Sequence, residues 1–395
     1  MRPEQSQQPD FDTVIDRRSQ RATKWLEVET VHNSRGEPVI PLWIADMEFT
    51  SPQPVLAAIR KTLDHGILGY GEWPADFAQA FCQWQASRHQ WSINPEWLLS
   101  CQSVITALDV VIRTLTQPQD EVIVLTPGFG NFTRVINHTG RTVVEVPLVE
   151  NGLHYELDVA RIEASITERS KMLILCNPHN PIGKVWNKQE LTQIAELCFR
   201  RGLLLVSDDV HQELILGNTP YTPIATLEER YADFTMTFTS PCKTFNLSGL
   251  PVAQLVIKDA EIREKLRHEL YQLSVHQPDI LAMAACDAAY RHGGKWLDAL
   301  LSYLRENYAL LESGLQPMQS VSLFKLEGTY LAWLDFRNSG LSPSELEHKL
   351  LYEAGLKLNN GLKFGAAGAG FMRLNFALPR AELVKVVARL QRSFK

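Results

Sequence analysis

The sequence has no excess of basic residues. Its 39 Lys and Arg side chains are outnumbered by 45 Asp and Glu, which gives a formal net charge of -6 and a pI of about 6.0. Binding to nucleic acid or to an anionic membrane surface requires a basic surface. The composition therefore argues against both as general partners and leaves only a local basic patch open.

The sequence also lacks paired cysteines and long apolar runs. Its six cysteines form no C-x-x-C pair and no Cys/His spacing typical of zinc sites, and several lie in apolar stretches, where free cysteine behaves as a small hydrophobe. No stretch reaches the roughly 20 apolar residues of a membrane-spanning helix. The polar start, MRPEQSQQPDFD, has no apolar segment of the kind found in secretory signals. We therefore predict a soluble cytoplasmic protein without a bound metal.

The middle of the chain alternates short apolar runs with helical patterns. The runs end in Gly, Pro, Asn or Asp, which is typical of strands buried on both faces of a sheet. They lie at residues 122–125, 172–176, 203–206, 234–239 and 252–257. Between them, residues 188–201 place Leu191, Ile194 and Cys198 on one face of a helix. This alternation predicts a three-layer α/β fold, with a mostly parallel central sheet and helices on both faces.

The last hundred or so residues follow a different pattern, which predicts a smaller α+β domain. Residues 295–315 form a long amphipathic helix pattern, and 328–336 and 371–378 are typical of strands. A helix after Ser342 has Glu345 three residues further on, as in a capping box, and its end is marked by Gly355. We therefore divide the chain into an N-terminal segment at 1–50, packed partly with the small domain, a large domain at 51–290 and the small domain at 291–395.

Polar and aromatic side chains follow the predicted strands, where open α/β sheets bind their ligands. Phe129, Asn180, Asp208 and Lys243 each follow a different strand, and Asn177, Asp209, His211, Ser240 and Cys242 accompany them. Taken alone, each has an ordinary alternative: a core aromatic, a turn former, a helix cap and a surface lysine. Because four different chemical groups converge on one crevice, we favour a functional site.

Pyridoxal 5′-phosphate matches each member of this set. A lysine amine forms a Schiff base with the cofactor aldehyde, and the fold can lower its pKa so that it is nucleophilic. A carboxylate keeps the pyridine nitrogen protonated, which makes the ring an electron sink. An amide can donate to the ring's phenolate oxygen, and an aromatic can stack on the ring face. We therefore predict Lys243, Asp208, Asn180 and Phe129 as cofactor contacts in these roles.

The cofactor phosphate needs a helix N-terminus with small or hydroxyl residues. Ser103, Val104 and Ile105 open a predicted helix that continues to Leu115, which makes this N-terminus a candidate. A plain amphipathic helix with Ser103 as its N-cap accounts for the same pattern. Ser240 could add a hydroxyl to the same phosphate.

Arg373 lies in an otherwise apolar strand, FMRLNFAL, after the glycine-rich stretch FGAAGAG. A buried arginine needs a partner. That partner is either a structural ion pair or the carboxylate of a substrate, which a guanidinium holds bidentately. The glycine-rich stretch precedes a strand instead of following one, so it is not a dinucleotide-binding motif, and we expect a mobile loop.

Motifs along nearly the whole chain resemble fold-type I pyridoxal phosphate enzymes of the class I/II aminotransferase superfamily, and within it the MalY/PatB group of cystathionine β-lyases (C–S lyases). They are FDTVIDRRSQRATKW near the start, PLWIADMEF (41–49), GYGEWP (69–74), CNPHNPIGKVW (176–186), SDDVHQEL (207–214), SPCKTFNLSGL (240–250), GTYLAWLDFR (328–337) and GFMRLNFALPR (370–380). The first motif and WIADM are specific to the group. The Asn-Pro, Asp and Lys motifs are shared by the whole superfamily.

The resemblance implies a role for each site residue. Lys243 would be the Schiff-base lysine and the acid/base at the substrate α-carbon, and Asp208 would bind the pyridinium nitrogen. Asn180 and His211 would contact the ring oxygen, and Arg373 would hold the substrate α-carboxylate. Val104, Ile105 and Ser240 would cradle the phosphate. Tyr70 would reach the phosphate of the neighbouring subunit's cofactor, which implies a homodimer.

The sequence departs from the group at three positions. The stacking position, usually Tyr, is Phe129, so a phenol that could accept a proton in C–S cleavage is missing. Cys242 replaces a common Ser before the lysine, and Pro251 stands where many relatives have a phosphate-binding Arg. The resemblance favours a C–S β-lyase that cleaves cystathionine- or cysteine-type substrates to thiol, pyruvate and ammonia. An aminotransferase of a small amino acid and a regulatory protein that binds pyridoxal phosphate remain alternatives.

Overall fold

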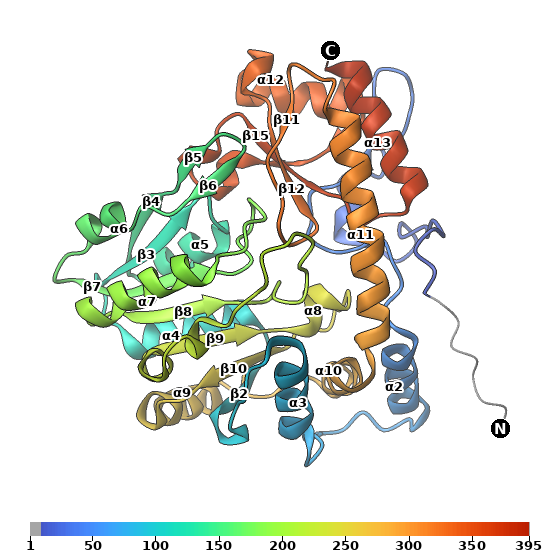
Figure 1. The fold of residues 1–395 in the computed structure, drawn as a ribbon. Helices are drawn as coiled ribbons and strands as arrows, with labels where there is room; N and C mark the ends of the chain where they lie inside the picture. Colours follow the sequence, from blue (N-terminus) through green and yellow to red (C-terminus); the bar gives the residue numbers. More distant parts are fainter. Residues whose placement is uncertain (1–8, 395) are drawn as a thin grey trace.

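A seven-stranded sheet forms the centre of the larger part of the molecule, in the order β2-β10-β9-β8-β7-β3-β4 (Figure 1). Its strands are β2 (Leu98–Cys101), β3 (Glu121–Thr126), β4 (Thr142–Pro147), β7 (Ser170–Cys176), β8 (Leu204–Asp208), β9 (Thr235–Thr239) and β10 (Ala253–Ile257). Neighbours pair in parallel, except that β10 runs antiparallel to both β9 and β2. The predicted mostly parallel α/β sheet is confirmed.

The computed structural model describes residues 9–394. The first eight residues belong to the polar stretch from which we argued against a secretory signal, and they lie outside the described residues. Within residues 9–394, no helix combines the length and the apolar character that crossing a bilayer requires.

Helices cover both faces of the central sheet because its strands are apolar on both sides. On one face, Val122 and Val124 of β3 pack with α4 (Val104–Leu115), α5 (Gly130–His138) and α9 (Ala260–Gln272). On the other, Ile123 and Leu125 pack with α6 (Val159–Ser165) and α7 (Lys188–Arg201). Full burial of such a side chain contributes roughly 1.5–3 kcal/mol. The bounds of α7 and α4 agree with the helices predicted from the sequence.

A four-stranded antiparallel sheet forms the centre of the smaller part, in the order β11-β12-β15-β14. Its elements are β11 (Ser322–Leu323), β12 (Leu331–Asp335), β14 (Asn359–Asn360), β15 (Phe371–Asn375), α12 (Pro343–His348) and α13 (Arg380–Ser393). The capping box of Ser342 and Glu345 is present. A π-helical turn, Lys349–Ala354, continues α12 and ends at Gly355, whose φ of 70° is left-handed. The predicted bounds of the domains stay a prediction.

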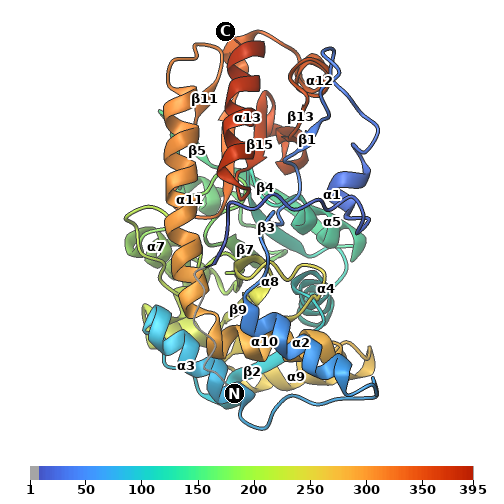
Figure 2. The ribbon, with the colours of Figure 1, turned by 90° about the vertical axis from the view of Figure 1, so that its right-hand side faces the viewer.

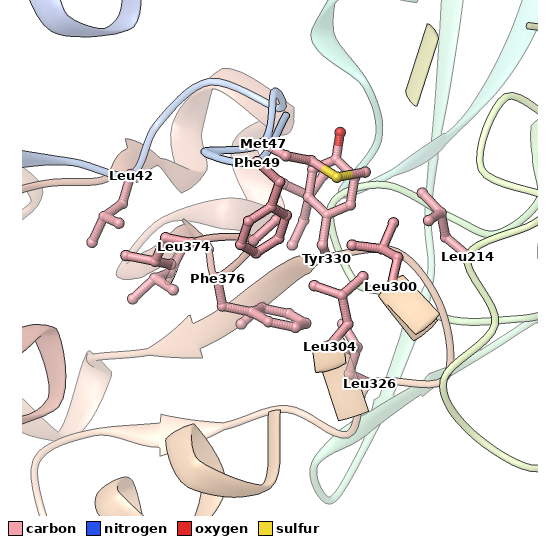
Figure 3. Packing of buried hydrophobic residues seen from close by; sticks show 14 of the residues in the cluster. Leu42, Met47, Phe49, Leu214, Leu300, Leu304, Leu326, Tyr330, Leu374 and Phe376 are labelled. Atoms are coloured by element: carbon pink, nitrogen blue, oxygen red, sulfur yellow. The ribbon is translucent and has the colours of Figure 1, made fainter. Parts of the chain in front are cut away.

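The N-terminal segment joins the two parts. Its strand β1 (Ile40–Pro41) pairs in parallel with β13 (Leu356–Lys357), and residues 42–49 then cross towards the large sheet. Met47 and Phe49 pack against Tyr330 and Phe376 of the smaller part and against Leu304 of α11 (Gly294–Leu315), as Figure 3 shows. Helices α2 (Gln53–Asp64), α3 (Phe77–His89) and α10 (Ile280–His292) lie at the end of the molecule opposite the C-terminus, near the lower end of α11 in Figure 2.

Candidate active site

Lys243 lies in a short helix directly after β9. Ser240 caps this helix, α8 (Pro241–Thr244): its Oγ accepts a hydrogen bond from the backbone N–H of Cys242 at 3.2 Å and donates one to the carbonyl of Val252 at 2.6 Å. The turn places Lys243 at the carboxyl edge of the sheet, where its Nζ donates to the carbonyl oxygen of Ala45 at 2.7 Å. Burial lowers the pKa of the Lys243 amine, which favours the neutral, nucleophilic form.

Asp208 is the last residue of β8, in register with Cys176 on one side and Phe238 on the other. Its side chain is buried, and the backbone N–H of Val210 donates to it at 3.4 Å. Burial raises its pKa to about 7, against the opposing effects of that N–H group and of Lys243. Within residues 9–394, no Lys, Arg or His side chain forms an ion pair with Asp208. A buried carboxyl in this position fits a cationic ring nitrogen.

Arg373 and Asn180 are joined by a hydrogen bond. Nη1 of Arg373 donates to Oδ1 of Asn180 at 2.9 Å, and Nη2 donates to the carbonyl oxygen of Trp43 at 2.8 Å. The guanidinium carbon also lies 4.9 Å from the ring centre of Phe364. In the described part of the chain, Arg373 forms no ion pair, and its buried Nε lacks a hydrogen-bond partner. The site therefore has a buried cation without an anion, as a substrate carboxylate requires.

His211 is buried close to these groups. Burial, together with the charges of Lys243 and Arg373, lowers the pKa of its imidazole to about 3, so the ring is neutral. Its Nδ1 has no hydrogen-bond partner within residues 9–394. A neutral imidazole with a free nitrogen fits the predicted contact with the ring oxygen of the cofactor.

Two further elements meet the same edge of the sheet. Phe129 directly precedes α5, and its ring packs edge-to-face on Phe132 with the centroids 5.4 Å apart, which holds it at the end of β3. Ser103 caps α4, and its Oγ accepts from the N–H of Thr106 at 3.1 Å. The first N–H groups of α4, from Val104 and Ile105, have no acceptor within the helix. They fit an anionic ligand such as a phosphate.

Ser240 and Tyr70 are the predicted contacts with the least support from the geometry. The hydroxyl proton of Ser240 already points to the carbonyl of Val252, so a phosphate would have to compete for it. Tyr70 lies between α2 and α3 with a fully exposed side chain, and no hydrogen bond within residues 9–394 joins it to another predicted site residue. Both contacts stay predictions.

The glycine-rich stretch FGAAGAG, for which we expected a mobile loop, lies among closely approaching backbones. A short 3₁₀ turn, Gly361–Phe364, leads into the stretch, and a second, Ala366–Gly368, lies within it. The backbones approach so closely that a Cβ on Gly361 would lie 2.0 Å from the carbonyl oxygen of Gly368, which explains the need for glycine. The carbonyl of Phe364 also accepts from the N–H of Gly128 at 2.8 Å, so the stretch is anchored beside Phe129.

The sequence reasoning missed the contribution of the N-terminal segment to the site. The carbonyl oxygen of Ala45 accepts from Lys243 and also from the hydroxyl of Tyr330, at 3.1 Å. The carbonyl of Trp43 accepts from Arg373. Backbone carbonyls carry no residue-type signal, although the motif WIADM that contains them was recognised as typical of one enzyme group.

The chain resembles known proteins over nearly its whole length. Residues 37–390 match the sequence model of the family Aminotransferase class I and II. The chain belongs to this family. It is 35% identical over 383 residues to cystathionine beta-lyase PatB of Bacillus subtilis, which covers 96% of this chain and 98% of that protein. It is 31% identical to Protein MalY of Escherichia coli, with 96% and 97% covered. These similarities confirm the predicted MalY/PatB resemblance.

Solved structures show the same fold. Cystalysin from Treponema denticola, which contains pyridoxal 5′-phosphate, superposes with a TM-score of 0.93 at 32% identity and covers 98% of this chain and 99% of that one. A pyridoxal phosphate-bound putative aminotransferase from Clostridium difficile gives a TM-score of 0.93 at 31% identity, with 98% and 100% covered. The fold is therefore that of the fold-type I enzymes, as predicted.

Proposed function

We propose that this chain is a pyridoxal phosphate-dependent C–S β-lyase, which cleaves cystathionine- or cysteine-type substrates to a thiol, pyruvate and ammonia. The observation that carries the proposal is the convergence of a buried carboxyl, a half-buried amine with a lowered pKa and a buried guanidinium without an anion at one edge of the sheet. The similarity to a cystathionine beta-lyase over 96% of the chain supports the same reaction.

The groups of the site fit the cofactor one by one. Asp208 would hold the ring nitrogen, Asn180 and the free nitrogen of His211 would contact the ring oxygen, and Phe129 would cover the ring face. The N–H groups of Val104 and Ile105, with Ser240, would hold the phosphate. When bound, the cofactor joins the substrate amine and withdraws electrons from its α-carbon.

The chain's own residues then orient the substrate and move its protons. Arg373 would bind the α-carboxylate through its fork, and Lys243 would accept the proton from the α-carbon. Loss of that proton and of the β-thiolate forms a carbon–carbon double bond. Protonation of the thiolate gives the free thiol, and water hydrolyses the resulting 2-aminoacrylate to pyruvate and ammonia. Asp208 would keep the ring nitrogen protonated throughout.

The test is an assay of the purified holoenzyme with L-cystathionine in the absence of any keto acid. We expect pyruvate, ammonia and free thiol in equal amounts. A strict need for a keto-acid acceptor would instead show that the chain is not a lyase. A Lys243→Ala variant should lose covalent attachment of the cofactor, and a variant that keeps it would refute the assignment of Lys243.

Transamination is the second candidate, and Phe129 favours it. The steps up to removal of the α-proton are the same, but Lys243 would return the proton to the cofactor instead of the β-substituent leaving. A phenol at position 129 could take part in C–S cleavage, and this chain lacks it. Assays with small amino acids and a keto acid measure this activity directly.

We also propose that the active form is a homodimer in which Tyr70 reaches the neighbouring site. Ile67, Leu68 and Tyr70 are exposed by 71%, 61% and 111%, an unusual concentration of apolar surface on one stretch. Sedimentation should show a dimer, and Tyr70→Phe should weaken binding of the cofactor without dissociating the dimer. The cytoplasmic location stays a prediction from the sequence.

A further inference from the structure

Residues 43–49, which we call the strap, run between the turn that carries Lys243 and the strand that carries Arg373. The strap offers a nearly continuous row of backbone carbonyls to the site and its surroundings. Trp43 accepts from Arg373, Ile44 and Asp46 accept from Asn375, Ala45 accepts from Lys243 and Tyr330, and Met47 and Phe49 accept from Asn246.

The strap is held in register on both sides. Asn246, three residues after Lys243, donates to the carbonyls of Met47 at 3.0 Å and Phe49 at 2.8 Å and accepts from the N–H of Met47 at 2.9 Å. Asn375, two residues after Arg373, donates to the carbonyls of Ile44 at 2.7 Å and Asp46 at 2.6 Å. A shift of the strap would therefore move the acceptors of both functional side chains.

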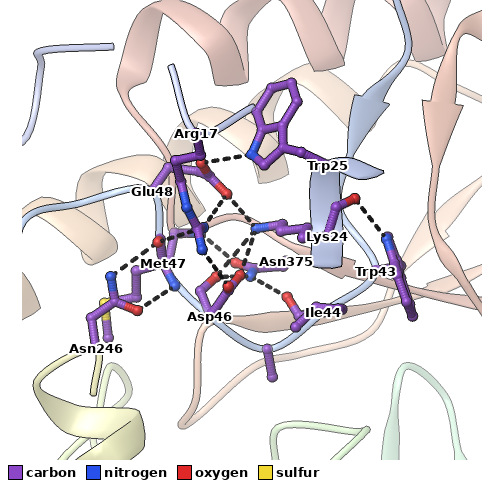
Figure 4. A network of polar contacts seen from close by, with 12 residues as sticks. Arg17, Lys24, Trp25, Trp43, Ile44, Asp46, Met47, Glu48, Asn246 and Asn375 are labelled. Atoms are coloured by element: carbon purple, nitrogen blue, oxygen red, sulfur yellow. Dashed lines mark hydrogen bonds and ion pairs between the residues drawn. The ribbon is translucent and has the colours of Figure 1, made fainter. Parts of the chain in front are cut away.

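Four charged side chains, two from the strap itself and two from the segment before it, form ion pairs with one another, and we call them the charge cluster (Figure 4). Arg17 pairs with Asp46 at 2.7 Å and with Glu48 at 3.0 Å. Lys24 pairs with Asp46 at 3.2 Å and with Glu48 at 2.8 Å. The Lys24 side chain is only 2% exposed, and that of Glu48 only 10%.

A buried cluster of this kind is a poor way to gain stability alone. Removing charges from water costs several kcal/mol per ion, and apolar replacements are often neutral or stabilising. What such a cluster supplies is a fixed geometry, because each charge has to keep its partners. Arg17 adds a direct contact with the strap, since its Nη1 donates to the carbonyl of Met47 at 3.2 Å.

We propose that the charge cluster is a positioning device, which fixes the strap so that the Ala45 carbonyl receives the amine of Lys243. Arg17, Lys24, Asp46 and Glu48 touch neither Lys243 nor Arg373 directly, and they act through the backbone of the strap. This assigns a role to the two most group-specific motifs of the sequence. The inference rests on the proposed role of Lys243 as the acid/base, but its test reads the amine itself.

Two effects of removing the Arg17 charge would change the pKa of Lys243 in opposite directions: movement of the strap, and loss of a nearby positive charge. A carbonyl that accepts from an ammonium stabilises the charged form, so loss of this acceptor lowers the pKa of Lys243. If the strap does not move, removal of a positive charge from the cluster raises the pKa of Lys243. Asp46 and Asp208 already raise the pKa of Lys243, as does Cys242, whereas burial, the dominant effect, and Arg373 lower it. The other titratable groups that face this region are His211 and Tyr330.

The experiment measures the pH dependence of acetylation of Lys243 in cofactor-free protein by mass spectrometry, for wild type, Arg17→Gln and Arg17→Lys. We expect the labelling midpoint to fall by about one pH unit in Arg17→Gln, and by less in Arg17→Lys, which keeps the charge but loses the fork. Arg113→Gln, which breaks an exposed pair with Asp109, is the matched control and should leave the midpoint unchanged.

A midpoint that rises or stays the same in Arg17→Gln, in protein with native circular dichroism, would overturn the proposal. If Arg17→Gln does not fold, Arg17→Lys is the deciding variant. It keeps the positive charge, so the loss of charge alone predicts no change in its labelling midpoint. Neither outcome depends on lyase activity. A chain that fails to cleave cystathionine but shows the expected fall would keep this inference and lose only the proposed reaction.

Discussion

Nη1 of Arg373 lies 2.9 Å from Oδ1 of Asn180, across 193 residues of sequence. One residue belongs to the smaller sheet and the other follows a strand of the larger one. The contact fixes the orientation of the guanidinium through Asn180, which is a predicted contact of the cofactor ring. The group that should hold the substrate carboxylate is therefore set relative to the group that should contact the ring, before any ligand binds.

This relationship predicts the effect of replacing the guanidinium of Arg373, with its two terminal nitrogens, by the single amine of lysine. Arg373→Lys cannot bond Asn180, the Trp43 carbonyl and a carboxylate together. We expect kcat/KM for L-cystathionine to fall by roughly 10²-fold, mostly through KM, because a hydrogen bond to a charged group contributes about 1.5–3 kcal/mol. Arg337→Lys, at an exposed pair with Asp335, should change neither parameter. A loss confined to kcat would contradict the assigned role.

The raised pKa of Asp208 predicts how the stability of the cofactor-free protein depends on pH. The pKa of the carboxyl is about 7 in the folded chain, against an ordinary value of 3.8, so the folded form holds an extra proton between these two pH values. Stability therefore falls as the pH rises from about 4 to 7. Asp208→Asn has no proton to lose, so we expect it to be more stable than wild type at about pH 8, by up to about 4 kcal/mol.

Urea unfolding of the cofactor-free proteins at about pH 4 and pH 8 checks this prediction. The two curves should nearly coincide at the lower pH and separate at the higher one. Asp109→Asn, at an exposed pair, should show no such separation. The same Asp208→Asn variant should lose lyase activity, so stability and function would change in opposite directions.

Phe129→Tyr tests whether the missing phenol limits C–S cleavage. If the ring stacks on the cofactor, tyrosine keeps the stacking and adds a group that can move a proton. We expect the ratio of elimination to transamination to rise by at least about threefold, with little change in cofactor affinity. Released pyruvate measures elimination, and the amino acid formed from an added keto acid other than pyruvate measures transamination. An unchanged ratio would place the control of the reaction elsewhere.

Asn246 offers a measure of how firmly the strap is held. Its φ of 58° is left-handed, and its side chain makes three hydrogen bonds with Met47 and Phe49. Asn246→Gly keeps the backbone geometry and removes the bonds, which should destabilise the protein by about 2–4 kcal/mol. Asn246→Ala should cost about 1 kcal/mol more, because alanine is strained at positive φ. Thermal or urea unfolding of the two variants separates these contributions.

The sheet and its strand-end residues were predictable from the sequence because both depend on local signals. Apolar runs of strand length, each ending in a turn, place Asp208 and Lys243 at one edge once the sheet is parallel. Helix caps are also local, and the box of Ser342 and Glu345 is present as predicted. These features need only the spacing of residue types along a short stretch.

The rest of the site depends on contacts between distant stretches. Nothing in the residue Ala45 shows that its carbonyl receives Lys243, which lies 198 residues away. The glycine-rich stretch at 364–370 suggested a mobile loop, and the close approach of Gly368 to Gly361 is visible only in three dimensions. The motifs that contain Arg17, Lys24 and Asp46 were recognised as specific, but their purpose depends on a charge cluster that no spacing rule describes.

The parallel pair of β1 and β13 has a consequence for the synthesis of the protein. Ile40 leaves the ribosome long before its partner Leu356. Contacts so distant in sequence form slowly, since a long loop has to close first. The nascent chain must therefore keep residues 42–49 unattached on that side until Leu356 has emerged. We expect the central sheet to form first and the ability to bind the cofactor to arise only after Leu356 has paired with Ile40.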